Sequence, residues 1–369
     1  MLVSGANDGS LCIWGRLPCG RAFSTTHVSL GEHTLGLRAL IPIPPCALAP
    51  GGGFATGSLD KVVRIFAWDA TTRTASVSAS LQGHAGGVDS LTVRTMLGEK
   101  PQLCSAARDG TVRQWSLDTG KCVGVLEGHE NSTKVIALGG GKIATGSAGR
   151  RDENNRHVDF KIRIWSPDAG GRLGIDKILT DHAQAVQDLD VLGEPSAGLW
   201  LSASNDGTVK ARGADGTPFE TIHMPPAPDG APTAVFRVRA LADGRIAAAC
   251  EDNTLRIFNA EDVTKAEDEI KLPGTPWAVR GLANGDVAIG CTHAGSGSRG
   301  HVYIFSRDAA RWASPDECAR FTRDLIPPAK GGPMNMVCSP KLFSRLVNLV
   351  NLELVDLVRV QDKTVLFLL

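Results

Sequence analysis

Short segments in which apolar and polar residues alternate recur along the chain, and each follows a turn that contains an aspartate. The segment from Ser105 to Trp115 is representative: small residues lead into Asp109-Gly110, and an alternating stretch that ends on Trp115 follows. An Asp-Gly pair between two strand-like segments is a strong signal for a tight β-hairpin. The pattern therefore predicts a chain of short antiparallel strands and an all-β fold.

The turn aspartate repeats at a nearly constant spacing, from 46 residues between Asp206 and Asp252 to 52 residues between Asp8 and Asp60. A period of this length suits four short strands and their turns, as in one blade of a β-propeller. The hairpins resemble the cores of WD repeats, and they are centred on Asp8, Asp60, Asp109, Asp159, Asp206 and Asp252. A further hairpin at 287–305 brings the units to seven, so we expect a seven-bladed WD40 β-propeller over residues 1–312.

A histidine stands upstream of the aspartate in three repeats, 25 residues before Asp109, 30 before Asp159 and 24 before Asp206. In WD repeats this histidine, the turn aspartate, a strand hydroxyl and the tryptophan share a buried hydrogen-bond network, which fixes the register of the sheet. We assign this network to His84, Ser105, Asp109 and Trp115, to His129, Asp159 and Trp165, and to His182, Ser202 and Asp206. Two departures predict weaker blades, because Arg212 replaces the aromatic in the fifth unit and Ala248 replaces the hydroxyl in the sixth.

Both ends of the chain depart from the repeat. The sequence starts inside the first unit, so we expect an incomplete first blade, as in a fragment or a truncated gene model. The alternative is that residues 23–48 or the C-terminal tail supply the missing strands. After the propeller we expect an exit helix over 313–325, with Ser314 at its N-cap, and then a tail over 326–369. Apolar residues in the tail recur at both helical and strand spacings, which leaves helix and strand open. If extended, residues 351–360 would add a strand to blade seven.

Charge and composition exclude several partners. The 39 basic and 39 acidic residues give a formal net charge of zero, so no overall attraction favours nucleic acid or an anionic membrane. The nine cysteines are scattered and none forms a Cys-x-x-Cys pair, which favours reduced thiols. Met1 leads straight into a strand rather than a secretory signal. We therefore expect a cytoplasmic and nuclear protein.

No set of residues predicts catalysis, a metal site or a cofactor site. Residues 295–300 match the G-x-G-x-x-G pattern, but a strand at 301–305 follows where a dinucleotide site needs a helix. The histidines lack metal-ligand spacing, and three of them already have the structural role. We expect a protein that is not an enzyme and needs neither a cofactor nor a metal.

Partner binding is expected on the face of the propeller that displays the residues just before the turn aspartates. These residues are mixed in character: Asn7, Leu59, Arg108, Asn205 and Glu251. Phe236 and Trp277 stand at the start of the predicted innermost strands of blades six and seven, where aromatic rings are candidate anchors for a protein partner. The alternative is that either ring merely packs between blades.

The last blade carries the most specific resemblance. It contains the turn Asn284-Gly285-Asp286, and its final strand leads to Arg311-Trp312-Ala313-Ser314. Together these segments resemble the end of the propeller in the phospholipase A-2-activating protein family, the ubiquitin-fusion-degradation adaptors. The resemblance implies a non-enzymatic adaptor in ubiquitin-dependent degradation that binds ubiquitin through the propeller, with Trp277 and Phe236 facing the apolar patch of ubiquitin.

The same resemblance implies a hexameric AAA segregase as a partner of the family. Family members hold the segregase through downstream domains that are absent from this chain, so segregase binding is not expected here. The competing function is a generic WD-repeat scaffold that binds another protein or a peptide.

Overall fold

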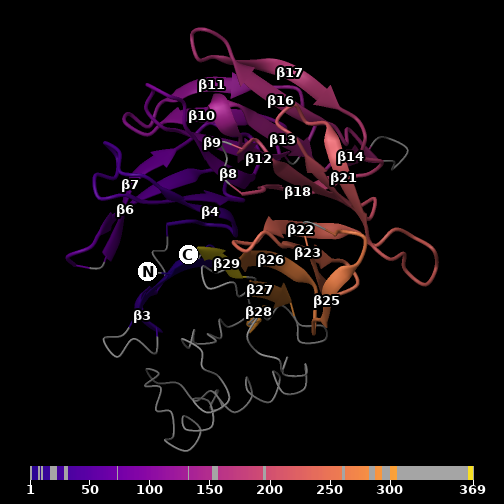
Figure 1. Ribbon diagram of the computed structural model, residues 1–369. Helices are drawn as coiled ribbons and strands as arrows, with labels where there is room; N and C mark the ends of the chain where they lie inside the picture. Colours follow the sequence, from indigo (N-terminus) through magenta and orange to yellow (C-terminus); the bar gives the residue numbers. More distant parts are fainter. Residues whose placement is uncertain are drawn as a thin grey trace, which may run out of the picture.

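In the part of the chain that the structure describes, seven antiparallel sheets stand around a common axis (Figure 1). The structure is a computed structural model. Six of the sheets have four strands and one has three, so the fold is the seven-bladed WD40 β-propeller that the sequence predicts. The described residues are 2–6, 9, 11–16, 23–28, 32–72, 74–131, 133–151, 157–193, 197–259, 262–281, 287–292, 300–305 and 365–368.

The strands of each blade are named in order from the innermost strand, at the axis, to the outermost strand. Blade one contains β29 (Val365–Leu368), β1 (Leu2–Ala6), β2 (Leu11–Arg16) and β3 (Phe23–Val28). Blade two contains β4 (Leu37–Ile43), β5 (Gly53–Ser58), β6 (Val63–Asp69) and β7 (Thr74–Leu81). Blade three contains β8 (Val88–Arg94), β9 (Gln102–Ala107), β10 (Val112–Ser116) and β11 (Cys122–Leu126).

The remaining blades follow the same order. Blade four contains β12 (Thr133–Ala137), β13 (Ile143–Ser147), β16 (Ile162–Pro167) and β17 (Leu173–Leu179). Blade five contains β18 (Val186–Val191), β19 (Trp200–Ser204), β20 (Thr208–Arg212) and β21 (Pro218–His223). Blade six contains β22 (Val235–Ala240), β23 (Ile246–Cys250), β24 (Thr254–Phe258) and β25 (Ala266–Lys271). Blade seven contains β26 (Pro276–Gly281), β27 (Val287–Thr292) and β28 (Gly300–Phe305).

Two short elements lie within blade four. A 3-10 turn, Gly139–Gly141, connects β12 to β13. A small two-stranded sheet, β14 (Arg150–Arg151) with β15 (His157–Val158), extends the turn between β13 and β16. Among the described residues no helix is long and apolar enough to cross a membrane.

The core lies between the blades, because each sheet buries both faces against its neighbours. One apolar cluster, for example, joins Ile65 and Leu81 of blade two to Val88 and Leu103 of blade three, and all four side chains are buried. The second strand of a blade is built of small residues because the next blade approaches it closely. A Cβ atom added to Gly57 would come within 2.7 Å of the Val88 side chain. The small-residue half of the sequence motif is therefore a packing requirement.

The innermost strands close the ring. Each contacts the next around the axis, from β4 through β8, β12, β18, β22 and β26 to β29, and β29 contacts β4. Figure 1 shows these strands gathered around the centre, with the fourth strands at the rim.

The first blade obtains its innermost strand from the far end of the chain. The N-terminal residues supply three strands, and β29 pairs with β1 in antiparallel register, with Ser4 opposite Phe367. The expected incomplete blade is therefore a four-stranded sheet, and of the two sources considered the tail supplies the missing strand. β29, at residues 365–368, pairs with β1 of blade one. The predicted exit helix over 313–325 and the segment 351–360 lie outside the described residues.

We predict that removal of residues 365–369 lowers the melting temperature. The deletion exposes the backbone groups of β1 that pair with β29 and opens the contacts of β29 with β4 and β26. Thermal unfolding followed by circular dichroism would measure the change, with deletion of Leu369 alone as the control. An unchanged melting temperature in the longer deletion would mean that this strand does not close the ring in solution.

Candidate functional site

A chain of hydrogen bonds crosses the interior of blade three. Trp115 Nε1 donates to Ser105 Oγ at 2.8 Å. Ser105 Oγ in turn lies 2.7 Å from His84 Nε2, and His84 Nδ1 lies 3.0 Å from Asp109 Oδ2. Because a carboxylate can only accept, His84 carries its proton on Nδ1, and the serine hydroxyl donates to Nε2. The structure thus brings together the four residues that the sequence assigned to this blade.

The aspartate also ties two loops together. Asp109 Oδ2 accepts the backbone N–H of Ala85 at 2.7 Å, and Asp109 Oδ1 accepts that of Thr111 at 2.9 Å. One carboxylate therefore fixes the loop before the innermost strand and the turn between the second and third strands. Loss of that carboxylate would leave the buried His84 imidazole without an acceptor, which is the costly case for a hydrogen bond.

Blade two contains the same network, although the sequence analysis missed its histidine. His33 Nδ1 lies 2.8 Å from Asp60 Oδ2, and His33 Nε2 lies 2.7 Å from Thr56 Oγ1. Glu32 precedes this histidine, so the Gly-His-like signal is absent. The spacing could have found it, because His33 stands 27 residues before Asp60, within the range of the other repeats.

Blade four uses a hydroxyl that the sequence analysis did not assign. Thr145 Oγ1 lies 2.8 Å from His129 Nε2 and accepts from Trp165 Nε1 at 2.8 Å. Asp159 lies 3.4 Å from His129 Nδ1. The residues between β13 and the aspartate displace the hydroxyl from its usual position four residues upstream. The run Ala-Thr-Gly-Ser, common to 55–58 and 144–147, marks it instead.

Blade five keeps its network with an arginine in the tryptophan position. His182 lies 2.8 Å from Asp206 Oδ2 and 2.9 Å from Ser202 Oγ, as assigned. Arg212, which is fully buried, donates from Nε to Ser202 Oγ at 2.9 Å. Its guanidinium also lies 5.3 Å from the centroid of the Trp200 ring. The sequence predicts that Arg212 weakens this blade by removing the tryptophan. In the structure Arg212 supplies the N–H donor that a tryptophan would supply, so the hydrogen-bond network of the blade is complete.

Blade six lacks a histidine and uses an arginine to hold its aspartate. Arg256 Nη2 donates to Asp252 Oδ2 at 2.6 Å, and Thr254 N donates to Asp252 Oδ1 at 3.2 Å. Ala248 is buried and offers no hydroxyl, as the sequence predicts. In blade one, the side chains of Ser4, Asp8 and Trp14 lie outside the described part of the chain.

The network sets the ionisation of its members. Burial by itself raises the pKa of Asp159. The hydrogen bond from His129 and the electrostatic attraction to this residue outweigh burial and hold the pKa of Asp159 at about 2. The pKa of Asp109 and that of Asp206 lie below the usual range because hydrogen bonds from histidine and threonine likewise overcome burial. Burial lowers the pKa of His129 and of His182 from 6.5, because it disfavours the charged imidazolium. In blades four and five the network therefore combines ionised aspartates with histidines that burial favours in the neutral form.

The predicted partner-binding residues share one end of the propeller. In four blades the residue before the turn aspartate donates its backbone N–H, at 2.9 Å, to the residue at the entrance of the innermost strand: Leu59 to Gly36, Arg108 to Gly87, Asn205 to Ala185 and Glu251 to Ala234. These four residues therefore lie on the face at which the innermost strands begin, here called the upper face. The fifth, Asn7, lies outside the described residues.

Phe236 and Trp277 lie on the upper face beside one another. Each occupies a β-bulge near the start of its innermost strand, where the ladder shifts register between Val235 and Arg237 and between Pro276 and Ala278. Their rings stack with centroids 5.3 Å apart and planes at 4°. Both side chains are partly exposed. The two rings therefore pack against each other between adjacent blades and remain partly exposed.

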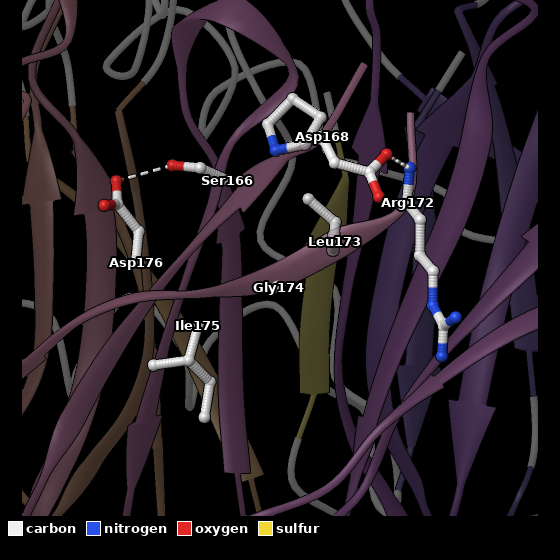
Figure 2. A pocket seen from close by; sticks show the side chains of 8 residues that line it. Ser166, Asp168, Arg172, Leu173, Gly174, Ile175 and Asp176 are labelled. Atoms are coloured by element: carbon white, nitrogen blue, oxygen red, sulfur yellow. Dashed lines mark hydrogen bonds between the residues drawn. The ribbon is translucent and has the colours of Figure 1, made fainter. Parts of the chain in front are cut away.

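A surface pocket lies elsewhere, on the outer hairpin of blade four (Figure 2). Its two carboxylates already accept hydrogen bonds within the hairpin: Asp168 from the backbone of Gly170 and Arg172, and Asp176 from the Ser166 hydroxyl. In the described residues no group of three His, Cys, Asp or Glu side chains could hold a metal ion. Nothing in this pocket suggests chemistry beyond that of a solvated hairpin.

The propeller of seven blades and its repeated His–Asp network define a WD-repeat β-propeller, a class whose members generally serve as protein-interaction scaffolds. Residues 75–116 match the WD domain, G-beta repeat family. The WD40 β-propeller domain of Doa1 has a similar structure, with a TM-score of 0.61 and 25% identity over 84% of this chain and 90% of that one.

Curated relatives match over short segments. Mitochondrial division protein 1 of Aspergillus clavatus is 38% identical over 63 residues, which are 17% of this chain and 8% of that protein. Its counterpart in Neurospora crassa is 31% identical over 86 residues, 23% of this chain and 11% of that protein. The chain thus matches only a small fraction of the length of these relatives, and the matches identify repeats rather than a whole protein.

We predict that Asp109→Ala destabilises the protein strongly. The change strands the buried imidazole of His84 and the hydroxyl that depends on it, at roughly 1 to 3 kcal/mol for each buried group left unpaired. Urea unfolding would measure the loss. Asp69→Ala is the matched control, because Asp69 also accepts backbone N–H groups in a turn but is exposed. Equal losses in the two variants would refute the network as the source of stability.

We predict that stability declines as the pH falls below about 6.5. The unfolded chain then protonates histidines whose folded pKa is lowered, so acid favours unfolding, and this contribution is complete above the unfolded pKa. Melting temperatures between pH 7.5 and 5.5 would show the slope. The slope should become shallower in His182→Gln and stay unchanged in His223→Gln, which alters an exposed histidine. A wild-type curve that is flat over this range would contradict the neutral-histidine assignment.

Proposed function

We propose that the protein is a non-enzymatic ubiquitin-binding adaptor in ubiquitin-dependent protein degradation, and that it binds ubiquitin through the upper face. The observation that carries the proposal is the stacked pair of Phe236 and Trp277, which presents an aromatic surface at the start of two adjacent innermost strands. Large aromatic side chains supply much of the binding energy at protein interfaces. A ring pair that is already stacked loses little conformational freedom when a partner covers it.

The choice of ubiquitin rests on the resemblance of the last blade to the ubiquitin-fusion-degradation adaptors. The likeness to the Doa1 propeller, which covers most of both chains, supports the same group of propellers. The apolar patch of ubiquitin is complementary to an aromatic anchor. The polar residues of the upper face would form the surrounding rim: Arg108 and Asn205 on other blades, and Glu251 on the same blade as Phe236. Asn7 and Leu59 complete the proposed set.

The second candidate function is a WD-repeat scaffold for another protein or a peptide. The mixed character of the upper face favours it, because an apolar leucine, a cation, an amide and an anion occupy the equivalent position in four blades. Such a surface could be complementary to many partners. For either function we propose that the protein is located in the cytoplasm and the nucleus. No contact with a segregase is proposed for this chain.

We predict that Trp277→Ala abolishes a weak interaction with ubiquitin. Loss of a hot-spot aromatic costs about 2 kcal/mol or more, which is about thirtyfold in affinity. Titration of labelled mono-ubiquitin by NMR would measure the effect, and circular dichroism would check folding. Phe219→Ala is the matched control, because Phe219 is 59% exposed on the outer strand of blade five.

The outcome separates the two candidates. A folded Trp277→Ala variant that binds ubiquitin as tightly as the wild type would remove the site assignment. If the wild type itself shows no ubiquitin binding, the scaffold for another partner becomes the better function.

A further inference from the structure

The connection between blades five and six is an exposed, proline-rich segment, residues 225–232, here called the arm. It lies between the end of β21 and the start of β22, and half of its residues are prolines: Pro225, Pro226, Pro228 and Pro232. Seven of the eight residues are exposed, and Ala227 is half-buried. Asp229 is the one charged residue of the arm. The arm therefore offers mainly proline rings to a partner.

Two buried residues hold the base of the arm on the body of the propeller. Met224 donates its backbone N–H to the carbonyl oxygen of Gly207, in the turn of blade five, at 2.8 Å. Thr233 donates its hydroxyl to the carbonyl oxygen of Pro225 at 2.6 Å. These residues directly precede and follow the arm, so both of its ends are fixed.

A β-turn closes the tip of the arm. The backbone N–H of Gly230 donates to the carbonyl oxygen of Ala227 at 2.8 Å, and the N–H of Ala227 donates to that of Ala231 at 2.9 Å. Pro228 takes the second position of this turn, which suits its fixed φ, and Gly230 takes the last, with φ at 80°. Asp229 Oδ1 accepts the N–H of Ala231 at 3.0 Å. These bonds restrict the conformations that the arm can adopt.

The residues from Pro225 to Pro228 favour polyproline II geometry. The pyrrolidine rings of the three prolines in this stretch fix φ at about −65°. A residue that precedes proline is pushed toward extended ψ values, which applies to Pro225 and to Ala227. Residues 224–227 belong to no strand, helix or turn, as expected for a polyproline II segment.

The spacing of the prolines gives this stretch a ridge. A polyproline II helix has about three residues per turn, so residues three apart lie on the same side of it. Pro225 and Pro228 have this spacing, and both are exposed. The arm therefore carries the P-x-x-P pattern on one side, here called the proline ridge, with Pro226 off the ridge.

We propose that the arm docks in the aromatic-lined groove of a partner domain that recognises polyproline II segments. Grooves of this kind bind P-x-x-P ligands through aromatic side chains that contact the proline rings. Proline has no side-chain rotamer freedom to lose, and the arm is held at its base and its tip, so the entropic cost of docking is small. The proposal is independent of ubiquitin binding.

The test measures binding of the full chain to a panel of recombinant SH3 and WW domains by biolayer interferometry. We expect at least one domain to bind, and its affinity to fall about tenfold or more in Pro225→Ala and in Pro228→Ala, because each change removes a ring from the proline ridge. Pro226→Ala should have a smaller effect. Pro218→Ala is the matched control, since Pro218 is exposed at the start of β21, outside the arm, and should bind as the wild type does. Circular dichroism would check that each variant is folded.

A synthetic peptide of residues 222–234 should compete with the chain for the same domain, but with lower affinity, because the free peptide is not held in one shape. Trp277→Ala should leave this binding intact, which separates the arm from the surface proposed for ubiquitin. The proposal would be overturned if no domain of the panel bound the chain, if both ridge variants bound as the wild type does, or if Trp277→Ala weakened binding as much as they do. Equal losses in the Pro226→Ala and ridge variants would also contradict the proline ridge.

Discussion

The carboxylate of the turn aspartate is the interaction on which the blades depend. In blades two to five it accepts a hydrogen bond from a buried histidine that belongs to the loop before the innermost strand, while it also holds its own turn. The second ring nitrogen of the histidine is hydrogen-bonded to a hydroxyl on the second strand. Three strands of one sheet are thereby fixed in register by a single ionised group. Apolar packing between blades supplies the bulk of the stability, but it is tolerant of slippage, and the network is what specifies one alignment.

The sequence predicted the fold because the repeat is local. A hairpin signal, a constant period and a histidine at a fixed distance are all visible without knowledge of the three-dimensional structure, and they identified the networks of blades three and five. The failures have physical causes. The network needs an imidazole at the right distance, not the glycine before it, so His33 was missed; it needs a hydroxyl on the strand, not a fixed count of residues, so Thr145 was missed. Arg212 was taken for a defect because its type differs, although its N–H geometry serves the same purpose.

Closure of the ring could not be predicted from local patterns. The pairing of β29 with β1 joins the two ends of the chain, and no spacing or turn residue connects them. A strand of four apolar residues has no register signal of its own until a partner is known.

A β-bulge in the innermost strand marks a position at which the blades share a backbone geometry but differ in residue type. The innermost strand carries a bulge at the same place in five blades, and the bulged residues are Arg38, Asp89, Gln187, Phe236 and Trp277. A bulged residue is released from the ladder and can be re-aimed without disturbing the sheet. In blades two, three and five the His–Asp network fixes the strand pairing beside the bulge, and the bulged position differs in chemistry from blade to blade. Aromatic residues at two neighbouring bulges create the surface proposed for ubiquitin, whereas the charged residues Arg38 and Asp89 occupy two others and pair with each other. The bulge recurs with and without the histidine, so the backbone irregularity itself creates the positions at which the blades can differ.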